Sequence, residues 1–154
     1  MTKETQMIHA FPAHPFGHDI RREQLAQTFA ACHSWEEKYR QLVILSRQLP
    51  VLPAEDRTGV SEIKGCENRV WLDGTLNNDG TLHFWGDSDG RIVKGLLAVL
   101  LTEIEGFTPA ELLSLDLPAV FEQYKLSDQL SQSRRNGIAA LINAARIIAQ
   151  KFSD

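Results

Sequence analysis

The chain has 154 residues, with 16 basic and 20 acidic side chains and a formal charge of -4. This length suits one domain with one core, and the mild acidity argues against a broad nucleic-acid-binding surface. Two cysteines, Cys32 and Cys66, are too few for a disulfide-rich scaffold or a four-cysteine metal site. The longest apolar run, 96–101, is too short to cross a bilayer, and no signal peptide is evident, so we expect a cytoplasmic protein with reduced thiols.

Residues 1–19 are expected to form a flexible N-terminal arm, and residues 20–154 a single domain. The arm has no helical or strand periodicity and is interrupted by prolines. Its histidines are His9, His14 and His18, and their spacing alone suits a metal ion. Because neither a helix nor an acidic or thiol partner supports them, a loosely attached tail is the preferred interpretation.

Two helices are expected next, at residues 21–32 and 34–49. The buried stripe of the first is formed by Leu25, Phe29 and Cys32. That position gives Cys32 a role in the core. The second helix begins at Ser34, which has capping-box spacing to Glu37, and prolines end it.

Alternating apolar residues predict an antiparallel hairpin in the middle of the chain. Its first strand covers residues 70–76, and its second begins at Leu82. Pairing Leu76 with Leu82 keeps the apolar side chains on one face. This register leaves a three-residue loop ending at Gly80, which can take the left-handed conformation that such a loop requires. A short strand at 61–64 would add a third member.

The helical period returns after the hairpin. Residues 89–104 are apolar almost all round and predict a central helix. Short helices are expected after Thr108 and near Phe121, and the last helix begins near Ser133. The order of elements predicts an α+β fold, with a small antiparallel sheet of about three strands packed against helices.

Cys66 lies in a polar segment between strand-like pieces. Gly65 permits a sharp turn before the thiol, and Lys64 and Arg69 favour a thiolate if they approach it. The carboxylates that would oppose a thiolate are Glu62 and Glu67. The residues alone leave two interpretations open, a working thiol and a cysteine without a role that packs beneath the loop.

A Cys66–His83 pair is a third interpretation, since His83 lies on the hairpin that follows the cysteine. The register places His83 opposite Thr75, on the face away from Leu82. This favours an ordinary histidine on the solvent side of a strand.

The segment 61–71 resembles the cysteine loop of the SufE family, whose members accept sulfur from cysteine desulfurases. The other matching pieces are 35–39, 86–89, 92–96, Ser133, Arg134 and Gly137. The strings 65–72 and 14–17 resemble those of the CsdE branch of this family.

The resemblance implies that Cys66 takes sulfur as a persulfide, by attacking the outer sulfur of the donor persulfide. It implies that the desulfurase, and not this chain, binds pyridoxal phosphate, and that Cys66 is sheltered in an apolar pocket formed by the sheet and the central helix. The family fold resembles iron–sulfur scaffold proteins, but a single loop thiol favours a sulfur carrier. The residues expected to hold the loop or to face the partner are Glu62, Lys64, Gly65, Glu67, Asn68, Arg69, Asp87 and Arg134.

Other functions remain open at this stage. One is a binding adaptor of a desulfurase in which Cys66 is incidental, and another is a metal or cluster scaffold. The sulfur's destination, which the resemblance gives as iron–sulfur cluster assembly or tRNA modification, and the oligomeric state are left open.

Overall fold

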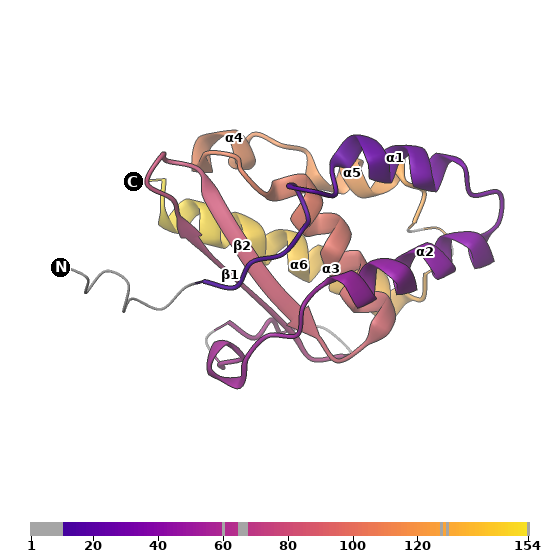
Figure 1. Ribbon diagram of the computed structural model, residues 1–154, viewed down its shortest axis with the longest axis horizontal. Coiled ribbons are helices and arrows are strands. Elements are labelled where there is room, and N and C mark those ends of the chain that lie inside the picture. Colours follow the sequence, from indigo (N-terminus) through magenta and orange to yellow (C-terminus); the bar gives the residue numbers. More distant parts are fainter. Residues whose placement is uncertain (1–10, 60, 65–67, 127, 129, 154) are drawn as a thin grey trace.

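In the part of the chain that the structure describes, six α-helices surround a two-stranded antiparallel sheet (Figure 1). The structure is a computed structural model and describes residues 11–59, 61–64, 68–126, 128 and 130–153. Its elements are α1 (Arg22–Ala30), α2 (Trp35–Gln48), a 3-10 helix (Ala54–Asp56), β1 (Val70–Leu76), β2 (Leu82–Ser88), α3 (Arg91–Ile104), α4 (Pro109–Leu113), α5 (Leu117–Gln123) and α6 (Gln132–Lys151). None of the described helices is long and apolar enough to span a membrane. The predicted α+β fold is confirmed.

The hairpin has the predicted register. Leu76 pairs with Leu82, and Gly80 has a φ of 88° in the turn between them. The expected third strand does not form among the described residues. Instead, a single bridge joins Glu62 to Trp71, because the pairing there extends over too few residues to make a strand.

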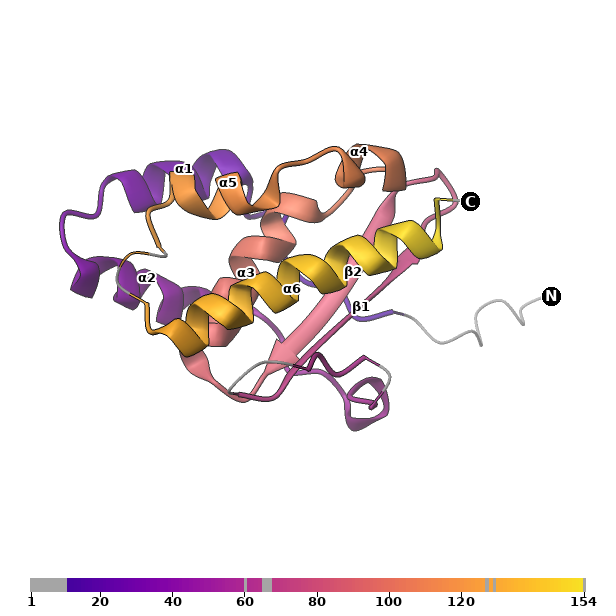
Figure 2. The same ribbon diagram turned by 180° about the vertical axis from the view of Figure 1, so that it is seen from behind.

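Helix α3 is the central helix. It contacts α2, α6 and β2 (Figures 1 and 2), and all its residues except Arg91 and Lys94 are buried. A Cβ atom at Gly95 would lie 2.4 Å from the carbonyl oxygen of Leu42. The absence of a side chain at this position therefore lets α2 and α3 approach each other closely.

Helix α1 ends two residues earlier than expected, and this changes the position of Cys32. Leu25 and Phe29 are buried, as their stripe predicts. Cys32 lies beyond the helix and is half-buried, with its Sγ 3.4 Å from the carbonyl oxygen of Thr28. Cys32 is therefore less buried than the sequence predicted, and it lies at the edge of the core.

Residues 11–20 lie across β2 (Figure 1), which corrects the expected arm for its described part. Phe16 is fully buried, and the His14 ring is buried against the sheet. A bridge between Phe16 and Ile20 closes a small turn around Gly17. The core therefore begins at Phe16 rather than at residue 20.

Candidate functional site

The two chain segments that flank the predicted cysteine loop lie side by side. Cys66, Gly65 and Glu67 lie outside the described residues. On either side of them, the Ile63 N–H donates to the Val70 carbonyl at 2.8 Å, and the Leu72 N–H donates to the Ser61 carbonyl at 2.9 Å. The chain therefore enters and leaves the loop at neighbouring points of the sheet edge.

Glu62 and Arg69 connect these two segments through their side chains. Arg69 Nε lies 3.0 Å from Glu62 Oε2, and Arg69 Nη2 lies 3.1 Å from Oε1, which makes the pair bidentate. The hydrogen bonds from Arg69 lower the pKa of Glu62, and those to Glu62 raise the pKa of Arg69. Because the Arg69 charge is engaged by Glu62, the expectation that it favours a nearby thiolate loses much of its basis.

The Arg69 side chain also contacts an aromatic ring. Its guanidinium carbon lies 5.0 Å from the centroid of the Trp71 ring, and that of Arg57 lies 5.5 Å from the same centroid. Two guanidinium groups therefore flank Trp71, in the distance range of cation–π contacts. Trp71 itself is buried, together with Leu52 and Trp85.

Asp87 is the buried carboxylate of the site, with 2% of the residue exposed. It accepts hydrogen bonds from the Leu52 N–H at 2.9 Å and from the Ser88 N–H at 2.7 Å. Lys94 Nζ lies 2.9 Å from Asp87 Oδ1. This carboxylate thus joins the segment before the cysteine loop to β2 and to the first turns of α3.

Ser88 and Asp89 hold the main chain of Arg69. The Ser88 hydroxyl donates to the Arg69 carbonyl at 2.8 Å, and the Arg69 N–H donates to Asp89 Oδ1 at 3.0 Å. Nearby, a Cβ atom on Gly90 would lie 2.5 Å from the Asn68 side chain, so Asn68 packs directly against this glycine. The end of β2 and the bend at 89–90 therefore fix the position of residues 68–69, which follow the loop.

The sequence-predicted site residues are only partly brought together. The structure joins Glu62, Asn68, Arg69 and Asp87 in one frame around the loop, while Lys64 is exposed at its entry. Arg134 lies in the first turn of α6, where its N–H donates to Ser131 Oγ at 3.3 Å. No described contact joins the Arg134 side chain to this frame.

A groove of about 440 Å³ opens beside the frame, between residues 61–64, β1 and α6. Its apolar lining includes Ile63, Leu72, Ile147 and Ile148. The expected pocket between the sheet and the central helix was to shelter Cys66, which lies outside the described residues. Among the described residues, α3 is closely packed against the sheet, and the groove beside the frame lies against α6. The residue that could have indicated this groove from the sequence is Ile147. It lies outside the buried stripe of α6, and 55% of it is exposed.

His83 does not lie beside the loop. It pairs with Thr75 as predicted, near the opposite end of β2 from Ser88, whose partner is Val70. Ser88 lies five positions after His83 along the strand, or about 16 Å away. Both ring nitrogens of His83 contact other groups, Glu105 and the Pro12 carbonyl, so the geometry gives no support to a Cys66–His83 pair.

Comparison with known proteins adds three findings. Residues 23–149 match the family model described as "SufE: Fe-S metabolism associated domain". The chain is 53% identical over 134 residues to "Sulfur acceptor protein CsdE" of Escherichia coli (strain K12), in an alignment that covers 87% of this chain and 91% of that protein. A solution structure of a hypothetical protein from Thermus thermophilus has the same fold, with a TM-score of 0.68 and 17% identity over 84% of this chain and 93% of that chain. The family model and the CsdE match together establish that the chain is a CsdE-like member of the SufE family.

Proposed function

We propose that this protein accepts sulfur from a cysteine desulfurase, with Cys66 as the acceptor. The observation that carries the proposal is the frame around the loop that contains Cys66. Glu62 and Arg69 join its two sides, while Asp87 and its neighbours hold the exit of the loop. A rigid frame that presents a short polar loop is the arrangement expected for a group that reacts with a partner.

The transfer needs one thiol on this chain. The Cys66 thiolate attacks the outer sulfur of the donor persulfide, a sulfur–sulfur bond forms to Cys66, and the bond to the donor cysteine breaks. The donor leaves as a thiolate, so no oxidant is consumed. The pyridoxal phosphate that releases sulfur from cysteine belongs to the desulfurase, and this chain works without a cofactor of its own.

We propose that the groove beside the frame can shelter the Cys66 thiol. Lys64, two residues before Cys66, lines it together with the apolar side chains from β1 and α6. An apolar surrounding raises the pKa of a thiol and so slows its oxidation. We propose that the loop shelters here in the free protein and turns outward when the desulfurase docks.

Mass spectrometry after incubation with a cysteine desulfurase and cysteine tests the proposal. We expect a mass increase of one sulfur atom that maps to Cys66 and disappears in Cys66→Ser. The matched control is Cys32→Ser, which should still accept sulfur at the wild-type rate because Cys32 is half-buried against the end of α1. A mass increase at Cys32 alone would overturn the assignment.

The same variants separate a sulfur acceptor from a binding adaptor. If Cys66→Ser binds the desulfurase but no longer stimulates it, the protein acts through its thiol. Full stimulation by Cys66→Ser would instead identify an adaptor. The next acceptor, in iron–sulfur assembly or in tRNA modification, and the cytoplasmic location remain predictions.

A further inference from the structure

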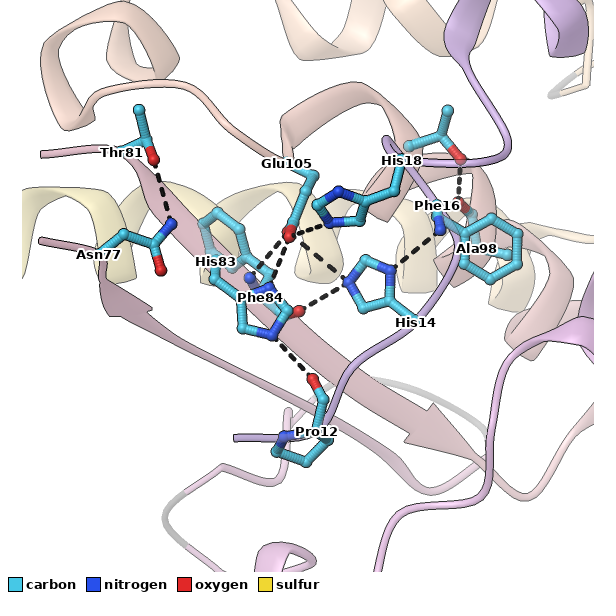
Figure 3. Close-up of polar contacts among 11 residues, drawn as sticks. Pro12, His14, Phe16, His18, Asn77, Thr81, His83, Phe84, Ala98 and Glu105 are labelled. Atoms are coloured by element: carbon cyan, nitrogen blue, oxygen red, sulfur yellow. Dashed lines mark hydrogen bonds and ion pairs between the residues drawn. The ribbon is translucent and has the colours of Figure 1, made fainter. Parts of the chain in front are cut away.

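Glu105 is a buried carboxylate that lies among three histidines (Figure 3). It follows the last residue of α3, and only 7% of it is exposed. His14 and His18 reach it from the N-terminal segment, while His83 reaches it from β2. The Phe84 N–H also donates to Glu105 Oε1 at 2.9 Å.

The contacts of His83 place a proton on each of its ring nitrogens. Nδ1 lies 2.5 Å from Glu105 Oε2, and Nε2 lies 2.7 Å from the Pro12 carbonyl oxygen. Both neighbours accept hydrogen bonds only, and a neutral imidazole has a single N–H. The imidazolium form alone satisfies both contacts, so His83 and Glu105 form a charged pair.

The pKa values of this pair agree with that assignment. The hydrogen bond to Glu105 raises the pKa of His83, although burial opposes the shift. Burial alone would raise the pKa of Glu105, but the surrounding histidines and the Phe84 N–H outweigh it and hold this pKa at about 2.

His14, unlike His83, accepts a hydrogen bond at one ring nitrogen and donates one at the other. These contacts are evidence against a metal site at His14, His83 and Glu105. The Phe16 N–H donates to His14 Nδ1 at 3.1 Å, so the proton of the neutral ring lies on Nε2. This Nε2 then donates to the Phe84 carbonyl at 2.8 Å and is 3.6 Å from Glu105 Oε1. No lone pair of His14 remains for a cation, and His83 presents protons rather than lone pairs.

The pair holds residues 11–18, which we call the strap, against the outer face of the sheet. Pro12 is bound through its carbonyl, and Phe11 stacks on Trp85 with 4.7 Å between ring centroids. Gly17 has a φ of 80°, and a Cβ atom there would lie 2.7 Å from Glu105 Cβ, so the strap closely approaches the aliphatic part of the Glu105 side chain. Trp85 in turn belongs to the apolar cluster with Leu52 and Trp71.

We propose that the proton on His83 fastens the strap to Glu105, so that the strap is closed in acidic to neutral solution and opens as the solution becomes alkaline. Above the pH at which His83 loses this proton, one of its two acceptors loses its donor. Either the half-buried Pro12 residue loses the donor to its carbonyl, or the buried Glu105 carboxylate keeps only the donors from Phe84 and His18. Opening of the strap would restore water to these groups and would uncover Trp85.

The sign of the pH dependence follows from the groups around His83. Glu105 and His14 contact His83, His18 contacts the same Glu105 oxygen as His83, and Asp73 lies diagonally across the sheet. Because the pKa of His83 is raised in the folded state, its contribution is complete below the ordinary value of 6.5 and is lost as the pH rises through the raised value. Glu105 contributes above 4.5 and stays ionised through this range.

Amide hydrogen exchange on the full chain tests the proposal. The reporters are the N–H groups of Gly17 and Ile20, which donate to the Ile20 and Pro15 carbonyls in the turn at the C-terminal end of the strap. Their protection factors, corrected for the intrinsic effect of pH, should fall between pH 6.5 and pH 9 while those of α3 do not. The fall should be about tenfold for each unit by which the folded pKa of His83 exceeds its unfolded value. Protection that is independent of pH would overturn the proposal.

A variant that keeps a donor but loses the charge gives the second test. In His83→Gln, strap protection at pH 6.5 should already be at the wild-type alkaline level and should no longer change with pH. The matched control is His33→Gln, at an exposed histidine outside the strap, which should behave as wild type. If the wild-type strap instead becomes protected at pH 9 on addition of zinc alone, the cluster is a metal site and the proposal is wrong.

Discussion

Asp87 shows how a single buried carboxylate determines the position of several segments. It is bound by two main-chain N–H groups and by Lys94, so its charge is compensated although only 2% of the residue is exposed. Removal of one member of a buried pair leaves the other charge without a partner, and this costs more than the loss of an exposed pair. The resemblance left the role of Asp87 open, and its contacts now identify it as a residue that holds the frame of the loop.

We expect Asp87→Ala to lower the free energy of unfolding by about 3 kcal/mol, because it leaves Lys94 and the Leu52 N–H unpaired. Urea unfolding at neutral pH measures this change. The control is Asp73→Ala on β1, where the carboxylate accepts from its neighbour Gly74 and the expected loss is below about 1 kcal/mol. Equal losses in the two variants would show that the contacts of Asp87 contribute no more to the free energy of unfolding than the single contact of Asp73.

At the scale of the elements, the sequence predicts best where contacts are local and periodic. The register of β1 and β2 follows from the alternation of apolar residues and from Gly80. The N-terminal segment could not be predicted in this way, because His14 binds Phe84, 70 residues away. Likewise, the binding of the Arg69 main chain by Ser88 and Asp89 depends on how the hairpin meets the loop, which no local pattern encodes.

The contact between α2 and α3 gives a prediction for Gly95. In Gly95→Ala the new methyl group would overlap the Leu42 carbonyl, so the two helices must separate. Such overpacking typically costs about 1–3 kcal/mol, and we expect a loss in the upper part of this range. Thermal unfolding followed by circular dichroism measures it. Gly59→Ala, where no atom lies within 4 Å of the new Cβ, should unfold close to the wild-type temperature.

For the whole molecule, two polar clusters lie at opposite ends of β2. The Asp87 cluster holds the cysteine-loop end, and the Glu105 cluster holds the strap at the other end. Each contains a buried carboxylate that binds segments from three parts of the chain. The stability of the molecule should therefore depend on the contacts of both carboxylates, and for Glu105 on its remaining ionised.

The Glu105 cluster predicts a specific loss of stability in acid. Because its folded pKa is about 2 and its ordinary value is 4.5, its contribution is present above pH 4.5 and is lost as the pH falls toward 2. We expect Glu105→Gln to lack about 2 kcal/mol of this pH-dependent stability. Urea unfolding at pH 6 and pH 3 measures the free energy of unfolding of both proteins. The difference between wild type and variant separates the contribution of Glu105 from that of the other carboxylates. An unchanged difference at the two pH values would contradict the prediction.

The half-buried position of Cys32 also bears on kinetic selectivity between the two thiols. Burial, together with the nearby Glu37 carboxylate, raises the pKa of Cys32, so little of it is thiolate at neutral pH. A protonated thiol attacks a persulfide slowly, because the thiolate is the nucleophile. The chain can therefore keep a second cysteine near its surface without diverting sulfur to it, and a neutral-pH alkylating reagent should leave Cys32 largely unmodified.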